Sequence, residues 1–234
     1  MYSVTTILDR GIPKHLSDWA AKQAAAFAVE HWEDLSSASE DMRFELISTA
    51  HQRARDVAAD KGDIVHTSAE NHLKGTPDGS SPKHIRQLEA FLKTAGLTPV
   101  HTEVTVWNRT IGYAGTADLI AIDKKSRHYL IDYKTGKGIW PEHAVQVEAL
   151  ARGEFIIHDD GGEEDMPFIN EVGILHLRPQ SWWFHPVVGD DAPQRNWSTF
   201  LGAKDIADWK RFHPSMVWGT TDRYNQANWE QYAA

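Results

Sequence analysis

Hydrophobic and polar positions divide the chain into a helical first part and a strand-rich middle. Up to residue 98, apolar side chains recur at the three- and four-residue spacing of amphipathic helices. We expect Gly62 to interrupt this pattern and Gly96 to end its last helix, because glycine is a common helix stop. The predicted helices cover residues 16–32, 39–59, 64–73 and 82–95.

After Pro99 the apolar residues alternate with a period of two, which is typical of strands. Three such runs follow one another with turn-like segments between them, and this order predicts a β-meander. The meander strands are expected at 100–107, 113–122 and 128–134, and the later elements are a helix at 142–155, an acidic loop at 158–167, a hairpin at 171–177 and 182–188, and a helix at 197–212.

This element order predicts an α/β, α+β-like fold in which helices flank a central mixed β-sheet. No linker divides the 234 residues, so we expect a single domain. Its mainly helical part would be residues 1–98, its sheet core residues 99–190, and its C-terminal helix and tail residues 191–234.

Composition excludes several classes of site. A hydrophobic fraction of 41% with 24% charged residues is typical of a globular protein, and the absence of Cys rules out disulfides, thiolate nucleophiles and iron–sulfur clusters. The net charge of -9 argues against coating nucleic acid by bulk charge, although five of the acidic residues lie within residues 158–165 alone. No apolar run reaches membrane-spanning length and no signal peptide is evident, so we expect a cytoplasmic protein without membrane contact.

Two aspartates face each other in the predicted hairpin. If residues 124–126 form its loop, Asp118 falls opposite Asp132, where like charges are destabilising. Both have apolar neighbours, so a raised pKa or a bound cation is expected, and paired carboxylate oxygens suit Mg²⁺ or Mn²⁺. Lys134 shares a face with Asp132 because it is two residues further along the strand. Such a group can hydrolyse a phosphodiester, whereas an isolated D-x-K is usually a solvated surface pair.

These residues also stand in a recognisable order. The segments GDIVHTSAENH, GTAD, DYKTGK and QVEAL, spread over residues 60–155, resemble the motifs of the PD-(D/E)XK nuclease superfamily, and particularly its RecB-like exonucleases of bacteriophage type. Residues 3–25 also resemble the start of phage members. The resemblance implies a restriction-endonuclease-like nuclease core with a helical N-terminal part. The chain differs from the family at Leu150, where the family motif has Tyr.

The resemblance assigns roles to individual residues. It implies that Asp118, Asp132 and Lys134 are catalytic, and that one or two ions of Mg²⁺ or Mn²⁺ are held by His66, Asp118, Asp132 and the backbone carbonyl of Tyr133. Without Cys, the chain would belong with the members that have no iron–sulfur cluster.

Five further residues are candidates for contacting DNA or supporting the metal ligands, and they are Glu70, Glu103, Gln146, Thr135 and Lys137. Glu70 lies one helical turn after His66, where a solvated Glu is equally plausible. A turn near residue 110 pairs Glu103 with Ala117, on the face away from Asp118, unless a bulge reverses it.

We therefore expect a divalent-metal-dependent DNA exonuclease that acts on linear duplex or single-stranded ends, in phage recombination, replication or DNA processing. A single-strand annealing protein would be a fitting partner, an oligomer would be compatible, and a phage-encoded enzyme would act in the host cytoplasm. Three alternatives remain open at this point. They are a structure-specific endonuclease or resolvase of the same fold, a DNA-binding module that does not cleave, and a hydrolase of small phosphoesters.

Overall fold

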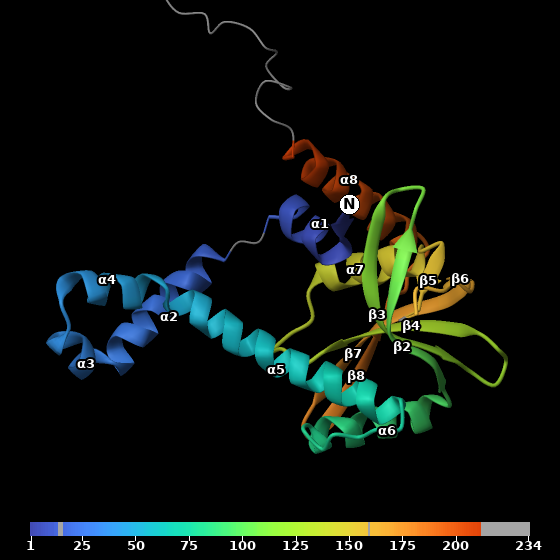
Figure 1. The fold of residues 1–234 in the computed structure, drawn as a ribbon, viewed down its shortest axis with the longest axis horizontal. Helices are drawn as coiled ribbons and strands as arrows, with labels where there is room; N and C mark the ends of the chain where they lie inside the picture. The colour runs from blue at the N-terminus through green and yellow to red at the C-terminus, as the bar shows by residue number, and fades with distance from the viewer. Residues whose placement is uncertain (14–15, 159, 212–234) are drawn as a thin grey trace, which may run out of the picture.

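The computed structural model describes residues 1–13, 16–158 and 160–211, and it confirms the predicted mixed α/β architecture. Within these residues an eight-stranded mixed sheet has the order β6-β5-β2-β3-β4-β7-β8, and β1 adds to β3 in parallel (Figure 1). The strands are β1 (Tyr2–Ser3), β2 (Thr98–Asn108), β3 (Tyr113–Ile122), β4 (His128–Lys134), β5 (Phe155–Ile157), β6 (Glu163–Asp165), β7 (Ile169–Arg178) and β8 (Ser181–Pro186).

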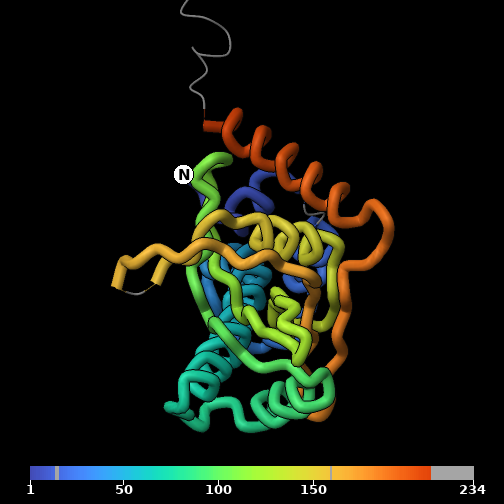
Figure 2. The backbone as a smooth tube through the Cα atoms, turned by 90° about the vertical axis from the view of Figure 1, so that its right-hand side faces the viewer, coloured from blue at the N-terminus to red at the C-terminus, as the bar shows by residue number. Residues whose placement is uncertain are grey.

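The helices lie on both sides of this sheet (Figure 1). They are α1 (Val4–Gly11), α2 (Ser17–Glu30), α3 (Trp32–Ser37), α4 (Glu40–Ser48), α5 (Ala50–Leu73), α6 (Pro82–Ala95), α7 (Pro141–Ala151) and α8 (Ala192–Trp209). Figures 1 and 2 show α7 and α8 on one side of the sheet and α6 on the other, and α2 to α4 extend away from it at the far end of α5. No helix of the described residues has the length and apolar character needed to cross a membrane.

The β-meander was predicted correctly. β3 and β4 have the expected bounds and β2 is slightly longer. The amide of Asp123 donates to the carbonyl of Arg127 (3.1 Å), which closes the three-residue loop, and Ser126 takes a positive φ of 59° there. This tight turn fixes the register of the hairpin, because a loop of given length allows few pairings.

Two separate apolar clusters cover the two faces of the sheet. In one, Ile120 and Leu130 pack with residues of α1, α7 and α8. In the other, Leu119 and Ile131 pack with residues of α5 and α6. The central strands are therefore buried on both faces, which explains their nearly continuous apolar sequences.

The expected break at Gly62 is wrong, because α5 continues through it from Ala50 to Leu73. A glycine inside a helix costs only about 1 kcal/mol relative to alanine. Further along, Val65 and Ala69 are buried against the sheet, and this packing keeps the helix continuous. Gly96, in contrast, ends α6 as predicted, with a left-handed φ of 66°.

The expected helix at 142–155 is too long, because α7 ends at Ala151 and β5 begins at Phe155. Gly153 turns the chain against β2, where an added Cβ would lie only 2.0 Å from Cγ1 of Val106. The acidic segment expected as a loop contains the short edge strand β6, paired antiparallel with β5. The connection from β4 to β7 passes through α7, β5 and β6, and the parallel pairing of β4 with β7 helps to make the sheet mixed.

Candidate metal centre

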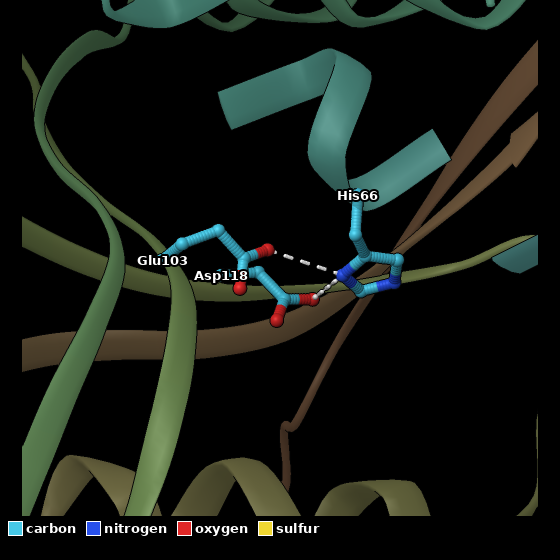
Figure 3. Close-up of side chains that lie close together, drawn as sticks. All are labelled: His66, Glu103 and Asp118. Carbon is cyan, nitrogen blue, oxygen red and sulfur yellow. Dashed lines mark hydrogen bonds and ion pairs between the residues drawn. The ribbon is translucent and has the colours of Figure 1, made fainter. Parts of the chain in front are cut away.

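Three potential metal ligands from different elements meet beside the central strands. His66 comes from α5, Glu103 from β2 and Asp118 from β3 (Figure 3). Nδ1 of His66 lies 3.2 Å from Oε1 of Glu103 and 3.4 Å from Oδ2 of Asp118. One ligand atom of each residue lies within 4.8 Å of the other two, so a single ion could contact all three.

An irregularity in β2 brings Glu103 into this group. The register expected from the sequence was wrong by one residue, because Val104 and not Glu103 pairs with Ala117. Glu103 has a φ of 49°, a left-handed conformation that costs a residue other than glycine about 1–3 kcal/mol. It consequently faces His66 rather than the opposite side of the sheet.

Asp118 is held by the neighbouring strand. Its carboxylate is almost fully buried, and Oδ2 accepts a 2.6 Å hydrogen bond from the backbone amide of Tyr133. The predicted β3–β4 register is correct as far as Leu119 opposite Ile131, but the regular pairing ends before Asp118 and Asp132. The carboxylate of Asp118 thus accepts the hydrogen bond of the Tyr133 amide in place of a backbone carbonyl, at the point where β3 and β4 separate.

A second polar group is centred on Asp132, on β4. Its Oδ1 accepts from Nε2 of Gln146 (2.9 Å), and its Oδ2 lies 2.6 Å from Nζ of Lys134. Gln146, on α7, also accepts a weak 3.3 Å hydrogen bond from Lys134. The structure therefore brings the predicted residues Asp132, Lys134 and Gln146 together. The carboxylate of Asp132 contacts the other two and is not part of the group formed by His66, Glu103 and Asp118.

The charges of the two groups influence one another. Burial by itself lowers the pKa of His66, but hydrogen bonds to Asp118 and Glu103 outweigh it and raise the pKa to about 10. Burial and the nearby charge of Asp118 raise the pKa of Asp132, despite the opposing effect of Lys134. Burial likewise raises the pKa of Glu103. The site concentrates negative charge where water is scarce, which favours a cation.

A cleft of about 590 Å³ opens this region to the outside, lined by His66, Glu103, Lys134 and Thr135 among others. Glu70 also lines it, and Oε1 of Glu70 accepts a 2.7 Å hydrogen bond from Lys74. A molecule in the cleft would therefore touch His66 and Glu103 of the first group and Lys134 of the second.

The remaining predicted residue, Lys137, is exposed in the segment after β4 and is not part of the cleft lining. That segment is fixed by two residues of β7 that the sequence did not single out. Arg178 donates to the carbonyls of Thr135 (3.0 Å) and Gly136 (2.6 Å), and Nε2 of His176 lies 2.8 Å from the same Gly136 oxygen. No local motif marks Arg178 or His176, because they reach the site only through the parallel pairing of β7 with β4.

The donor atoms are compatible with a divalent ion of the Mg²⁺ or Mn²⁺ type. Carboxylate oxygens suit both ions, and the imidazole of His66 suits Mn²⁺ better than Mg²⁺. Oδ2 of Asp132 is buried and accepts no well-directed hydrogen bond from the described residues, so it has unused bonding capacity. The chain has no Cys, so an iron–sulfur cluster has no thiolate ligands here.

Comparisons with known proteins leave the family open. No protein-family model matches the chain, and no curated protein matches it significantly. A solved structure described as "Crystal structure of SSO0001" shows a weak likeness, with a TM-score of 0.39 and 16% identity over 93% of this chain and 79% of that chain. A likeness of this size supports no conclusion about function.

Proposed function

We propose that the chain is a divalent-metal-dependent deoxyribonuclease that hydrolyses phosphodiester bonds from DNA ends. The observation that supports this most strongly is the placement of Lys134 and Asp132 beside the His66–Glu103–Asp118 group. A lysine next to a cation site can stabilise charge on a phosphate, which is what phosphodiester hydrolysis requires. The motif resemblance points to the same chemistry.

His66, Glu103 and Asp118 would hold the ion, and the carboxylate of Asp132 lies near enough to Asp118 for the two charges to interact. When bound, such an ion supplies Lewis-acid polarisation of the phosphate and a more acidic water. The protein keeps these ligands fixed through the hydrogen bond from the Tyr133 amide to Asp118. The ligand geometry therefore depends on the pairing of β3 with β4.

Lys134 would act on the substrate. Its ammonium group is held by Asp132 and Gln146, so it extends towards the cleft with a defined direction. It would donate a hydrogen bond to a nonbridging phosphate oxygen while a water molecule attacks phosphorus in line and the P–O bond to the leaving nucleotide breaks. Gln146 would then act by positioning Lys134, without itself touching DNA.

The proposal is tested with end-labelled linear duplex and Mg²⁺ or Mn²⁺. The wild-type protein should shorten the labelled DNA strand. The cleavage rate of Lys134→Ala and of Asp132→Ala should be at least about 100-fold lower, which is the loss typical of removing one group that stabilises transition-state charge. Lys125→Ala is the matched control, because Lys125 is an exposed lysine in the loop between β3 and β4. Equal cleavage by wild type and both site variants would refute the assignment.

Substrate topology separates the alternatives. An exonuclease leaves closed circular plasmid intact, whereas a structure-specific endonuclease nicks circular or branched DNA. If the protein binds linear duplex but leaves it whole with either ion, the non-cleaving module is correct. Copurification with a single-strand annealing protein would support the proposed place in recombination.

A further inference from the structure

A second group of side chains that could bind a metal lies near the start of β2, where His101 stands two residues before Glu103. Glu164, on β6, contacts two histidines through its two carboxylate oxygens. Its Oε2 lies 3.0 Å from Nε2 of His158, which follows β5, and its Oε1 lies 3.8 Å from Nε2 of His101, on β2. The two imidazole rings are 6.1 Å apart between centroids. Glu164 thus lies between a histidine of β2 and a histidine that follows β5.

We propose that His101, His158 and Glu164 form a second metal site, which takes a zinc-type ion and fastens the β5–β6 hairpin to β2. Two imidazoles and one carboxylate are a common ligand set for Zn²⁺, whereas Mg²⁺ prefers oxygen ligands alone. This site goes beyond the proposed nuclease function and does not depend on it.

The distances agree with such a site. Ligand bonds to Zn²⁺ of about 2.1 Å in a tetrahedral arrangement place the ligand atoms about 3.4 Å from one another. The two contacts of Glu164, at 3.0 and 3.8 Å, lie on either side of this value. Both histidines approach with Nε2, the atom that would bind the ion. Binding one ion would require the two imidazoles, whose centroids are 6.1 Å apart, to rotate towards each other around Glu164.

The surroundings leave a position for a fourth ligand. His101 and His158 line a cavity of about 280 Å³ together with Thr102, Glu103 and Lys74, so one side of the group is open to water. His101 is largely covered, with 16% of its side chain exposed, whereas His158 and Glu164 are 41% and 48% exposed. An ion would thus join one anchored ligand to two ligands on the hairpin.

The hairpin has a clear use for this connection. β6 is a three-residue strand at the edge of the sheet, and all three of its residues are acidic and exposed. Its anchors include the turn hydrogen bond from the amide of His158 to Gly162 (2.9 Å) and the ion pair of Glu163 with Arg109 (2.7 Å). A cation on Glu164 would offset part of its negative charge and tie it to β2.

The test measures zinc binding by the full-length, metal-stripped chain in equilibrium dialysis. Because His66 also offers an imidazole, we expect wild type to retain two equivalents of Zn²⁺, and His158→Ala and His66→Ala to retain one each. His51→Ala is the control, since His51 is a partly exposed histidine at the start of α5, and it should retain two. In His158→Ala, the affinity for the second Zn²⁺ should fall by more than about 100-fold, which exceeds the loss typical of removing a residue that only hydrogen-bonds to a metal ligand.

Thermal unfolding provides the second measurement. Zn²⁺ should raise the Tm of wild type more than that of His158→Ala or Glu164→Gln, while all three should have similar Tm values in chelator, because these side chains are partly exposed. If His158→Ala binds as much Zn²⁺ as wild type, with the same Tm response, the proposed site is wrong. Since DNA cleavage is not measured, this failure would leave the proposed nuclease function unaffected.

Discussion

The high pKa of His66 predicts how metal binding depends on pH. With a pKa of about 10, the imidazole carries a proton on both nitrogens at neutral pH, and Nδ1 faces Glu103 and Asp118. A metal ion needs a nitrogen without a proton, so binding at Nδ1 must release one. At pH values below this pKa, the apparent affinity for Mn²⁺ should therefore increase about tenfold for each unit by which the pH is raised.

Between pH 6.5 and 8.5 this gives an increase of about 100-fold, or roughly 2.7 kcal/mol of binding free energy. Isothermal titration calorimetry in two buffers with different ionisation enthalpies counts the released protons directly. Wild type and the control His51→Ala should release about one proton at pH 8, and His66→Gln close to none. Wild-type release near zero, or equal release by His66→Gln, would refute the reasoning, because His66 would then have an ordinary pKa.

Without metal, the same proton stabilises the folded chain. The pKa of His66 rises from 6.5 in the unfolded chain to about 10 in the folded one, so its contribution is complete below pH 6.5 and is lost as the pH rises towards 10. Urea unfolding in chelator should show stability falling across this window for wild type. His66→Gln should show a flatter profile.

Three further predictions concern stability in chelator, measured by urea unfolding. Gly11→Ala should destabilise the fold by about 1–3 kcal/mol, because the new Cβ would lie 2.3 Å from the backbone oxygen of Ala203. Gly202→Ala on α8 is the control and should stabilise the fold by about 0.5–1 kcal/mol, because open space surrounds Gly202. A greater loss of stability in Gly202→Ala than in Gly11→Ala would contradict the close packing of α1 against α8. Tyr133→Phe should stabilise by about 1 kcal/mol, since the buried hydroxyl has no partner among the described residues, and a loss would reveal one. Gln146→Leu should destabilise by about 1–3 kcal/mol by removing a donor from a buried carboxylate, while an unchanged stability would show that this contact contributes nothing.

The sequence predicts the hairpin of β3 and β4 well because the information there is local. Alternating apolar residues define the strands, and a three-residue loop fixes the pairing of Leu119 with Ile131. Since Asp132 and Lys134 are two residues apart on one strand, their proximity also follows from the local pattern. The motif order adds His66 and Gln146, which lie far apart in the sequence.

The parts that were not predicted depend on contacts between distant segments. The orientation of Glu103 depends on its φ of 49° and on the register of β2, and no neighbouring residue indicates either. The continuity of α5 through Gly62 depends on packing against the sheet. The group of His101, His158 and Glu164 assembles from β2, β6 and the residue that follows β5, and β6 reads as an acidic loop in the sequence.

The charges of the candidate metal centre give a reason to expect a proton and a divalent ion to exchange there. When the carboxylates of Glu103, Asp118 and Asp132 are all ionised and His66 and Lys134 are cations, the metal-free site carries one net negative charge. Replacing the His66 proton with a divalent ion makes the site neutral. Burial and the charge of Asp118 raise the pKa of Asp132, and the exchange would relieve the repulsion between the two carboxylates. It would also remove the negative charge that repels a phosphate, so metal binding and binding of the proposed DNA substrate should depend on each other.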